Sequence, residues 1–298
     1  MFTRYFTERK SATLPVLTVL VLVLLAGCAN NTTSTTASLT TSIKSTATSS
    51  TNLTSASATL KHMPVGNASF NWDHTSHMLT VQIIMTGLAP DSIHPTQIYT
   101  GTCNSLGKVA YPLENLAADS HGAVNATSKV SVPNGIPAQD WALNIHNGPG
   151  VSTADEALSI VCGNIANHDT SLRSSQAVQV PLTTAPASSK GENASGTATL
   201  SISGHTLKVE LTLTGLEPNS QHMAHIHTGS CSSQGPVLYP LPVIKANAAG
   251  KATLTTTIQN VTTIPSTGWY VNVHRGIDLS TQSGFDPISC GDVTAVHP

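Results

Sequence analysis

An internal repeat constrains the fold of this chain more than any other feature of the sequence. The segment TGLAP at residues 86–90 returns as TGLEP at residues 214–218, and 214 − 86 = 128. The Gly, Cys and Tyr-Pro-Leu residues of 101–113 and the Trp, Asn, His and Cys-Gly residues of 141–163 return with the same displacement. Because an ungapped register over roughly 80 positions is hard to obtain by chance, we predict duplication of a whole domain.

The cysteines follow this repeat. Cys28 stands apart near the N-terminus, and each repeat holds two cysteines at one spacing, since 162 − 103 = 59 and 290 − 231 = 59. In an oxidising compartment the pairs Cys103–Cys162 and Cys231–Cys290 are the economical assignment. The alternative is a thiolate metal site, although the close Cys-x-x-Cys spacing that is typical of such sites is absent.

The hydrophobic pattern is that of β-strands. In the second repeat, apolar residues at 200 and 202 and then at 207, 209, 211 and 213 alternate with polar ones, and residues 203–205 read as a turn. Further strands are expected near 223–227, 251–258 and 268–274, and no long amphipathic helix is present. We therefore predict an all-β protein of two tandem Greek-key barrels or sandwiches, each with one disulfide.

The N-terminus has the pattern of an export signal. Three basic residues at positions 4, 9 and 10 precede an apolar run at 14–25, which is too short to span a bilayer comfortably. The run ends at Leu25-Ala26-Gly27-Cys28, which resembles the lipobox of bacterial lipoproteins. We predict a signal peptide over 1–28, lipid on Cys28 and an extracytoplasmic, membrane-anchored protein. An ordinary secretory signal is the alternative.

Composition divides the rest of the chain. Residues 29–58 are dominated by Ser and Thr and are expected to form a flexible tether. The predicted domains cover 59–183 and 191–298, with a linker at 184–190. Charged residues make up 9% of the chain and the net charge is −2. A nucleic-acid partner is therefore excluded, because no basic stripe is available for a phosphate backbone.

A histidine cluster in the second repeat indicates a metal site. His225 and His227 alternate on an expected strand and so share a face. His274, in a second expected strand, supplies a third imidazole if the two strands are neighbours. Three neutral nitrogens suit copper or zinc, and His222 is the candidate for orienting a ligand from outside the coordination sphere. The alternative is a row of surface histidines on a half-exposed strand. Other histidines, His62 and His74 among them, are expected to be solvated.

The second repeat resembles two known families in the order of its motifs. The matching residues are Gly215-Leu216-Glu217-Pro218, His222, His225-Ile226-His227, Cys231, Gly235-Pro236-Val237, Asn272-Val273-His274 and Cys290-Gly291. They resemble copper/zinc superoxide dismutase and the CHRD domain, the chordin-type module. The resemblance implies an eight-stranded Greek-key barrel, copper ligands at His225, His227 and His274, and a family disulfide between Cys231 and Cys290.

Two departures from the dismutase pattern concern activity. Val237 stands where a dismutase has its metal-bridging histidine, and Pro287 stands where it has the arginine that guides superoxide. In the first repeat, Gln97 and Tyr99 replace the paired histidines and only His146 remains. We expect the first domain to be structural or to bind something else through a different face, and the second to bind one metal ion.

The sequence thus predicts a lipid-anchored protein with one copper site, which serves copper sequestration or weak superoxide chemistry; zinc is the less favoured metal. Whether it is an enzyme is left open. The alternative function is a non-catalytic recognition or adhesion module with a cell-surface ligand, in which the histidines are remnants.

Overall fold

The computed structural model describes residues 52–184, 191 and 194–296. The predicted signal peptide, Cys28, most of the predicted tether and residues 185–190 of the predicted linker lie outside these residues. In the described part of the chain, no helix is long and apolar enough to cross a membrane.

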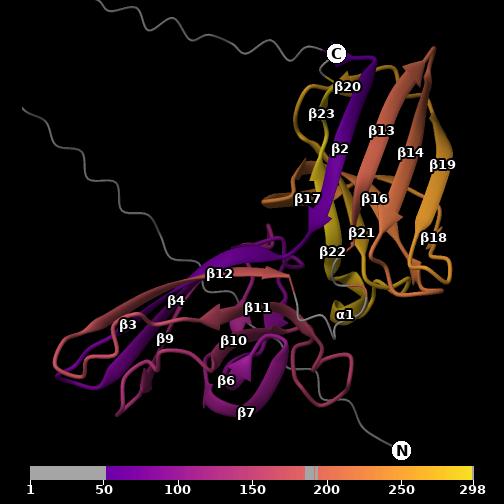
Figure 1. Cartoon of the computed structure of the whole chain (residues 1–298). Coiled ribbons are helices and arrows are strands. Elements are labelled where there is room, and N and C mark those ends of the chain that lie inside the picture. Colours follow the sequence, from indigo (N-terminus) through magenta and orange to yellow (C-terminus); the bar gives the residue numbers. More distant parts are fainter. Residues whose placement is uncertain (1–51, 185–190, 192–193, 297–298) are drawn as a thin grey trace, which may run out of the picture. The chain divides into compact units, whose positions relative to one another are not determined.

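The predicted all-β class is confirmed: two curled half-barrel sheets make up the described chain (Figure 1). Every pair of neighbouring strands in the first sheet is antiparallel. In spatial order, its strands are β7 (Ser105–Pro112), β6 (Thr96–Thr102), β10 (Trp141–His146), β11 (Ser159–Ile165), β12 (Gln176–Thr184), β3 (Val65–Trp72), β4 (Met78–Thr86) and β9 (Val124–Ser131).

The second sheet repeats this order. Its strands are β17 (Ser233–Pro240), β16 (Ala224–Ser230), β21 (Trp269–His274), β22 (Pro287–Asp292), β2 (Ser55–His62), β13 (Ser195–Ser203), β14 (Thr206–Thr214) and β19 (Ala252–Gln259), with β23 (Thr294–Ala295) paired to β2. The expected hairpin is present, because β13 and β14 pair from Ser203–Thr206 outward. Gly204 takes φ 60° in its turn, a conformation that glycine adopts at little cost.

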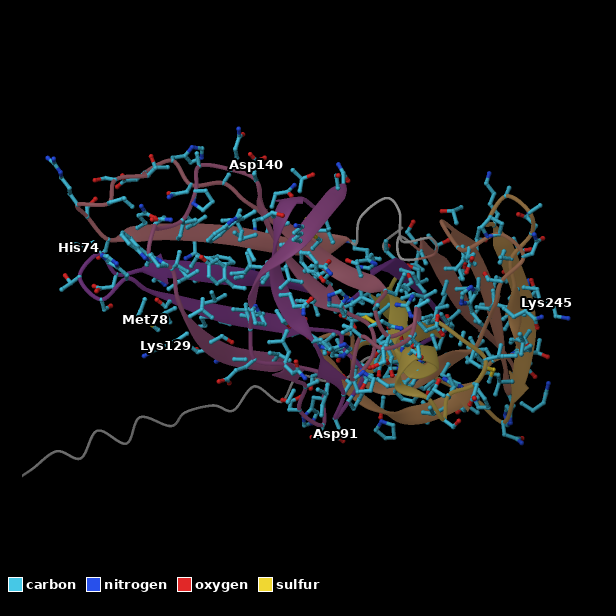
Figure 2. All side chains as sticks on the ribbon, turned by 90° about the horizontal axis from the view of Figure 1, so that it is seen from below. His74, Met78, Asp91, Lys129, Asp140 and Lys245 are labelled. Carbon is cyan, nitrogen blue, oxygen red and sulfur yellow. A yellow bond between two sulfur atoms is a disulfide. The ribbon has the colours of Figure 1, made fainter. Side chains whose placement is uncertain are left out.

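Short elements complete each half. They are the strand pairs β1 (Asn52–Leu53) with β20 (Ile264–Pro265), β5 (Ile93–His94) with β8 (Leu116–Ala117) and β15 (Gln221–His222) with β18 (Ile244–Lys245), and the helix α1 (Gln282–Phe285). The turn between β3 and β4 carries His74, which is exposed as expected (Figure 2).

Each sheet curls around its own hydrophobic core because its strands alternate buried and exposed positions. Phe70 and Trp72 are fully buried in the first core. In the second, the apolar residues of β14 at 207, 209, 211 and 213 are buried, while those at 208, 210 and 212 face solvent. This alternation is the period-two signal that predicted the strands.

The two predicted disulfides are confirmed. Cys103 bonds to Cys162 and Cys231 bonds to Cys290, with Cα–Cα distances of 5.8 and 5.9 Å. Closing a loop of 59 residues stabilises each half by about 4 kcal/mol on the chain-entropy model. The thiolate metal site is thereby excluded for these four cysteines.

Strand β2 belongs to the second sheet, although it precedes the first sheet in the chain. Strand β2 precedes β3 in the chain by only two residues, yet it pairs with β13 and β22 of the second sheet (Figure 1). Strand β12 precedes β13 in the chain, yet it pairs with β3 and β11 of the first sheet. The registers correspond, since Leu60 lies opposite Gly196 and Leu182 lies opposite Gly66. The second sheet is therefore completed by a strand from before the first sheet, in the place that β12 takes in the first sheet.

The pairing of β2 with the second sheet moves the domain boundary that was expected at residue 58. Strand β2 begins at Ser55, and its Ala56 and Ala58 are buried in the second core rather than being part of a solvated tether. Small residues on a Ser-rich strand lack the strong alternation of Val, Ile and Leu, so this strand reads as low-complexity sequence. A fragment of 191–298 lacks β2, and its sheet would be open between β22 and β13.

Candidate metal centre

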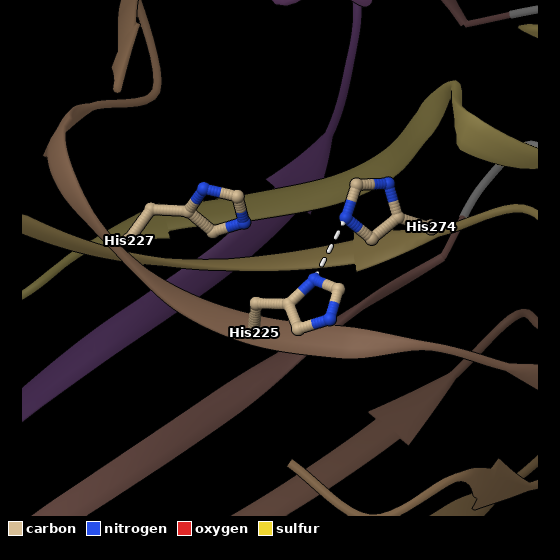
Figure 3. Close-up of side chains that lie close together, drawn as sticks. All are labelled: His225, His227 and His274. Carbon is tan, nitrogen blue, oxygen red and sulfur yellow. Dashed lines mark hydrogen bonds between the residues drawn. The ribbon is translucent and has the colours of Figure 1, made fainter. Parts of the chain in front are cut away.

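The three predicted ligand residues lie together on two adjacent strands of the second sheet. Strands β16 and β21 pair with Ile226 opposite Val271, and these two side chains are buried in the core. The alternating residues His225 and His227 therefore project from the other face of β16. His274 ends β21 on the same face, and the three imidazoles turn toward one another (Figure 3).

The three imidazoles are close enough to share one ion. One nitrogen from each ring lies within 4.8 Å of the others, and Nδ1 of His225 is 3.1 Å from Nε2 of His274. An ion about 2.0–2.1 Å from each nitrogen would hold them about 3.3–3.6 Å apart. The cluster can therefore hold a metal ion.

Backbone carbonyls fix the orientation of two of the rings. His227 donates from Nδ1 to the carbonyl of Gly235 at 2.9 Å, and His274 donates from Nδ1 to the carbonyl of Phe285. This leaves Nε2 of each ring as a lone-pair donor. Nε2 of His227 is buried and has no hydrogen-bond partner among the described residues. Such carbonyl bonds to the distal nitrogen are typical of histidines that bind metals.

Burial keeps these imidazoles neutral. Burial, together with the neighbouring imidazoles, lowers the pKa of His225 and of His274 to about 4. It also lowers the pKa of His227, against the opposing effect of the hydrogen bond to Gly235. At neutral pH the cluster therefore holds three uncharged imidazoles, the form in which histidine binds a metal.

An aromatic ring and the disulfide support the cluster from behind. Tyr270 stacks on His227 with ring centroids 4.9 Å apart, and its hydroxyl donates to the same Gly235 carbonyl at 3.4 Å. Tyr270 in turn packs against the Cys231–Cys290 disulfide and against Met63, which directly follows β2. Strand β2 is thus separated from the histidine cluster by one layer of side chains. Tyr270 was not predicted as part of the site, although positions 270, 272 and 274 alternate on one face of β21.

His222 contacts the backbone of a ligand residue rather than any imidazole of the cluster. Its Nδ1 hydrogen-bonds to the carbonyl of His274 at 3.0 Å and its Nε2 to Ser220 at 2.6 Å. In the first sheet His94 makes the same two bonds to the equivalent carbonyl and serine. Because the bonds persist where no histidine cluster exists, they stabilise the strand end in both halves, independently of a metal.

The equivalent position in the first sheet is closed by hydrogen bonds. The hydroxyl of Tyr99 donates to Oε1 of Gln97 at 2.5 Å and lies 3.0 Å from Nε2 of His146. Asn144 reaches the same nitrogen from Nδ2 at 3.3 Å. The His146 ring is still oriented by a backbone carbonyl, that of Ala157 at 2.8 Å. The first half therefore retains the ring-orienting geometry while its lone imidazole is satisfied by protein groups.

One expectation about the remaining histidines is wrong. His62 was expected in solvent, but it is 8% exposed at the end of β2. Burial, together with the positive charge of Arg275, lowers its pKa to about 4. Its place in the alternation of Ala56, Ala58 and Leu60 was the signal for burial, and it was missed because that strand was assigned in part to the tether.

Comparison with known protein families detects a CHRD domain at residues 169–276. This region contains β12 and all three clustered histidines, and it ends before Cys290. It begins at residue 169, before β12 of the first sheet, so the sequence domain and the structural sheet do not coincide. A search among curated proteins gives no match.

Proposed function

We propose that the second sheet binds one copper ion through His225, His227 and His274, and that the chain sequesters copper or reacts slowly with superoxide. The observation that carries this proposal is the cluster itself: three buried, neutral imidazoles whose nitrogens lie within 4.8 Å of one another. Burying three convergent imidazoles without a bound ligand costs free energy of folding, because each ring carries polar atoms that need hydrogen-bond partners.

The donor set favours copper over zinc. Only imidazole nitrogens converge here, and no carboxylate or thiolate joins the group among the described residues. A nitrogen site binds Cu²⁺ more tightly than Zn²⁺ in the usual order of divalent metals. Three histidines with an open position also occur at catalytic zinc, so zinc is the competitor that the experiment must include.

The chemistry proposed for the site is slow. A bound copper ion would supply one-electron redox chemistry, while the chain supplies the dry, neutral surroundings and the ring orientation. Fast reaction with superoxide also needs a positive field that attracts the anion. Pro287 offers no charge where the dismutase pattern has its arginine, and Val237, 48% exposed, offers no bridging nitrogen. The proposal is therefore one copper per chain, with sequestration as its main role.

The proposal includes the location. Export followed by lipid attachment at Cys28 would place the copper site outside the cytoplasm, at the membrane surface. The sequence of residues 1–28 supports this, and the two disulfides suit an oxidising compartment.

The test is metal stoichiometry on the purified full chain. The chain is equilibrated with Cu²⁺ or Zn²⁺, desalted and measured for bound metal per chain. We expect one copper in the unsubstituted protein, and much less in His225→Ala and in His274→Ala. His205→Ala removes an exposed turn histidine and His146→Ala removes the equivalent imidazole of the first sheet; both should retain one copper. Binding that survives His225→Ala and His274→Ala would overturn the proposal, and no binding at all would favour the recognition module.

A further inference from the structure

A buried amide beside the histidine cluster has no partner in the protein. Asn272 is 1% exposed, and neither Nδ2 nor Oδ1 has a hydrogen-bond partner among the described residues. A buried amide without partners is costly, and native structures tolerate such groups mostly at functional positions.

The backbone places this amide on the ligand face. Asn272 lies on β21 two residues before His274, so the two side chains project to the same side of the sheet. Asn272 is also directly opposite His225 in the pairing of β16 with β21. Residues in such a cross-strand pair have Cβ atoms about 4.5–5.5 Å apart. The amide is therefore next to two of the three imidazoles.

The first sheet shows what the same asparagine does when no metal site is present. Asn144, the equivalent residue at 272 − 128 = 144, has both ends satisfied. Its Oδ1 accepts a hydrogen bond from Ser159, and its Nδ2 lies 3.3 Å from Nε2 of His146. The amide can thus reach the ring nitrogen that corresponds to a predicted ligand atom.

The second sheet has lost the group that would hold its asparagine. The position equivalent to Ser159 is Pro287, since 287 − 159 = 128, and proline offers no hydroxyl. Nε2 of His274 faces Nδ1 of His225 instead of an amide. One half therefore has a closed hydrogen-bond network, and the other has three convergent nitrogens with an uncommitted amide beside them.

We infer that Asn272 is a positioning residue for a small anion bound at the open position of the metal. This deepens the proposed function and rests on it. The amide Nδ2–H donates a hydrogen bond to the anion, and Oδ1 accepts one from a protonated ligand such as water. The proposed ligand is an anion of two or three atoms, such as superoxide or azide. It is small because its surroundings are buried and Asn272 supplies only one neutral hydrogen-bond donor.

The first arm of the test needs no metal. Asn272→Leu removes an unsatisfied amide at nearly constant volume, so the unfolding temperature of the metal-free chain should rise by a few degrees. Asn144→Leu is the matched control, and it should lower that temperature because Ser159 and His146 lose their partner. A fall for Asn272→Leu similar to that for Asn144→Leu would overturn the inference whether or not copper binds.

The second arm uses azide as a probe of the copper-loaded full chain. Azide affinity is measured by visible absorption, alongside copper per chain. Asn272→Ala should keep one copper and bind azide about ten- to hundredfold more weakly, the loss of one hydrogen bond to a charged ligand. Unchanged azide affinity with one copper retained would overturn the inference and leave the proposed function standing. Absence of histidine-dependent copper binding would overturn both.

Discussion

Replacing Leu60 with alanine should loosen the second sheet, although Leu60 lies close before the first sheet in the chain. Its side chain is 1% exposed in the second core, opposite Gly196 of β13. Removing a fully buried leucine side chain to Cβ costs about 2–5 kcal/mol. At 1.4 kcal/mol per tenfold change, the equilibrium for opening the surrounding strands rises about 30-fold to several thousand-fold.

Peptide-resolved hydrogen exchange measures where this loss falls, because local opening is specific to a cooperative unit. Leu60→Ala should accelerate exchange in β13 and β22, the partners of β2. Leu182→Ala is the matched variant on β12, and it should accelerate exchange in β3 and β11 instead. Faster hydrogen exchange of β3 in Leu60→Ala, with β13 unchanged, would refute the place of β2 in the second sheet.

Two further predictions concern the sites themselves. The double substitution Gln97→His and Tyr99→His should raise copper binding from one ion to two per chain, because the carbonyl of Ala157 already orients His146 as that of Phe285 orients His274; stoichiometry that stays at one would show that the first sheet lacks more than its two histidines. The free energy of unfolding of the metal-free chain should be highest above about pH 6.5 and should fall toward pH 4. The pKa values of His62, His225 and His274 are about 4 in the folded chain and 6.5 when unperturbed. The unfolded state therefore binds more protons in that window. The urea midpoint checks this, and a midpoint that is constant from pH 7 to 4.5 would contradict burial of neutral imidazoles.

Much of the fold could be predicted because the repeat carries strong local signals. The alternation of Leu207, Val209, Leu211 and Leu213 depends only on the period of a strand, and the matched cysteine spacing required no knowledge of the topology. Pairing between distant strands carries no such signal. Nothing local in Ala56, Ala58 and Leu60 shows that they pack on a strand about 140 residues later, so the boundary at residue 58 and the burial of His62 were missed.

The clustering of three histidines could be predicted from the sequence, and the surroundings of the cluster could not. His225 and His227 share a face in any strand, and His274 follows from the repeat, so the three residues could be named from spacing. The role of His222 could not, because a hydrogen bond to a backbone carbonyl leaves no pattern in sequence. A signal for Asn272 is present in the sequence, because Pro287 stands where the first repeat has Ser159. The role of that difference becomes clear only from the hydrogen bonds of Asn144.

The central claim is one mononuclear copper site made of three histidines, and X-ray absorption of the copper-loaded full chain tests it most directly. We expect three imidazole nitrogens about 2.0–2.1 Å from the ion, the usual metal–imidazole distance, and two imidazoles when His274→Ala retains any copper. A shell of oxygen or sulfur ligands, or an imidazole count unchanged by His274→Ala, would contradict it.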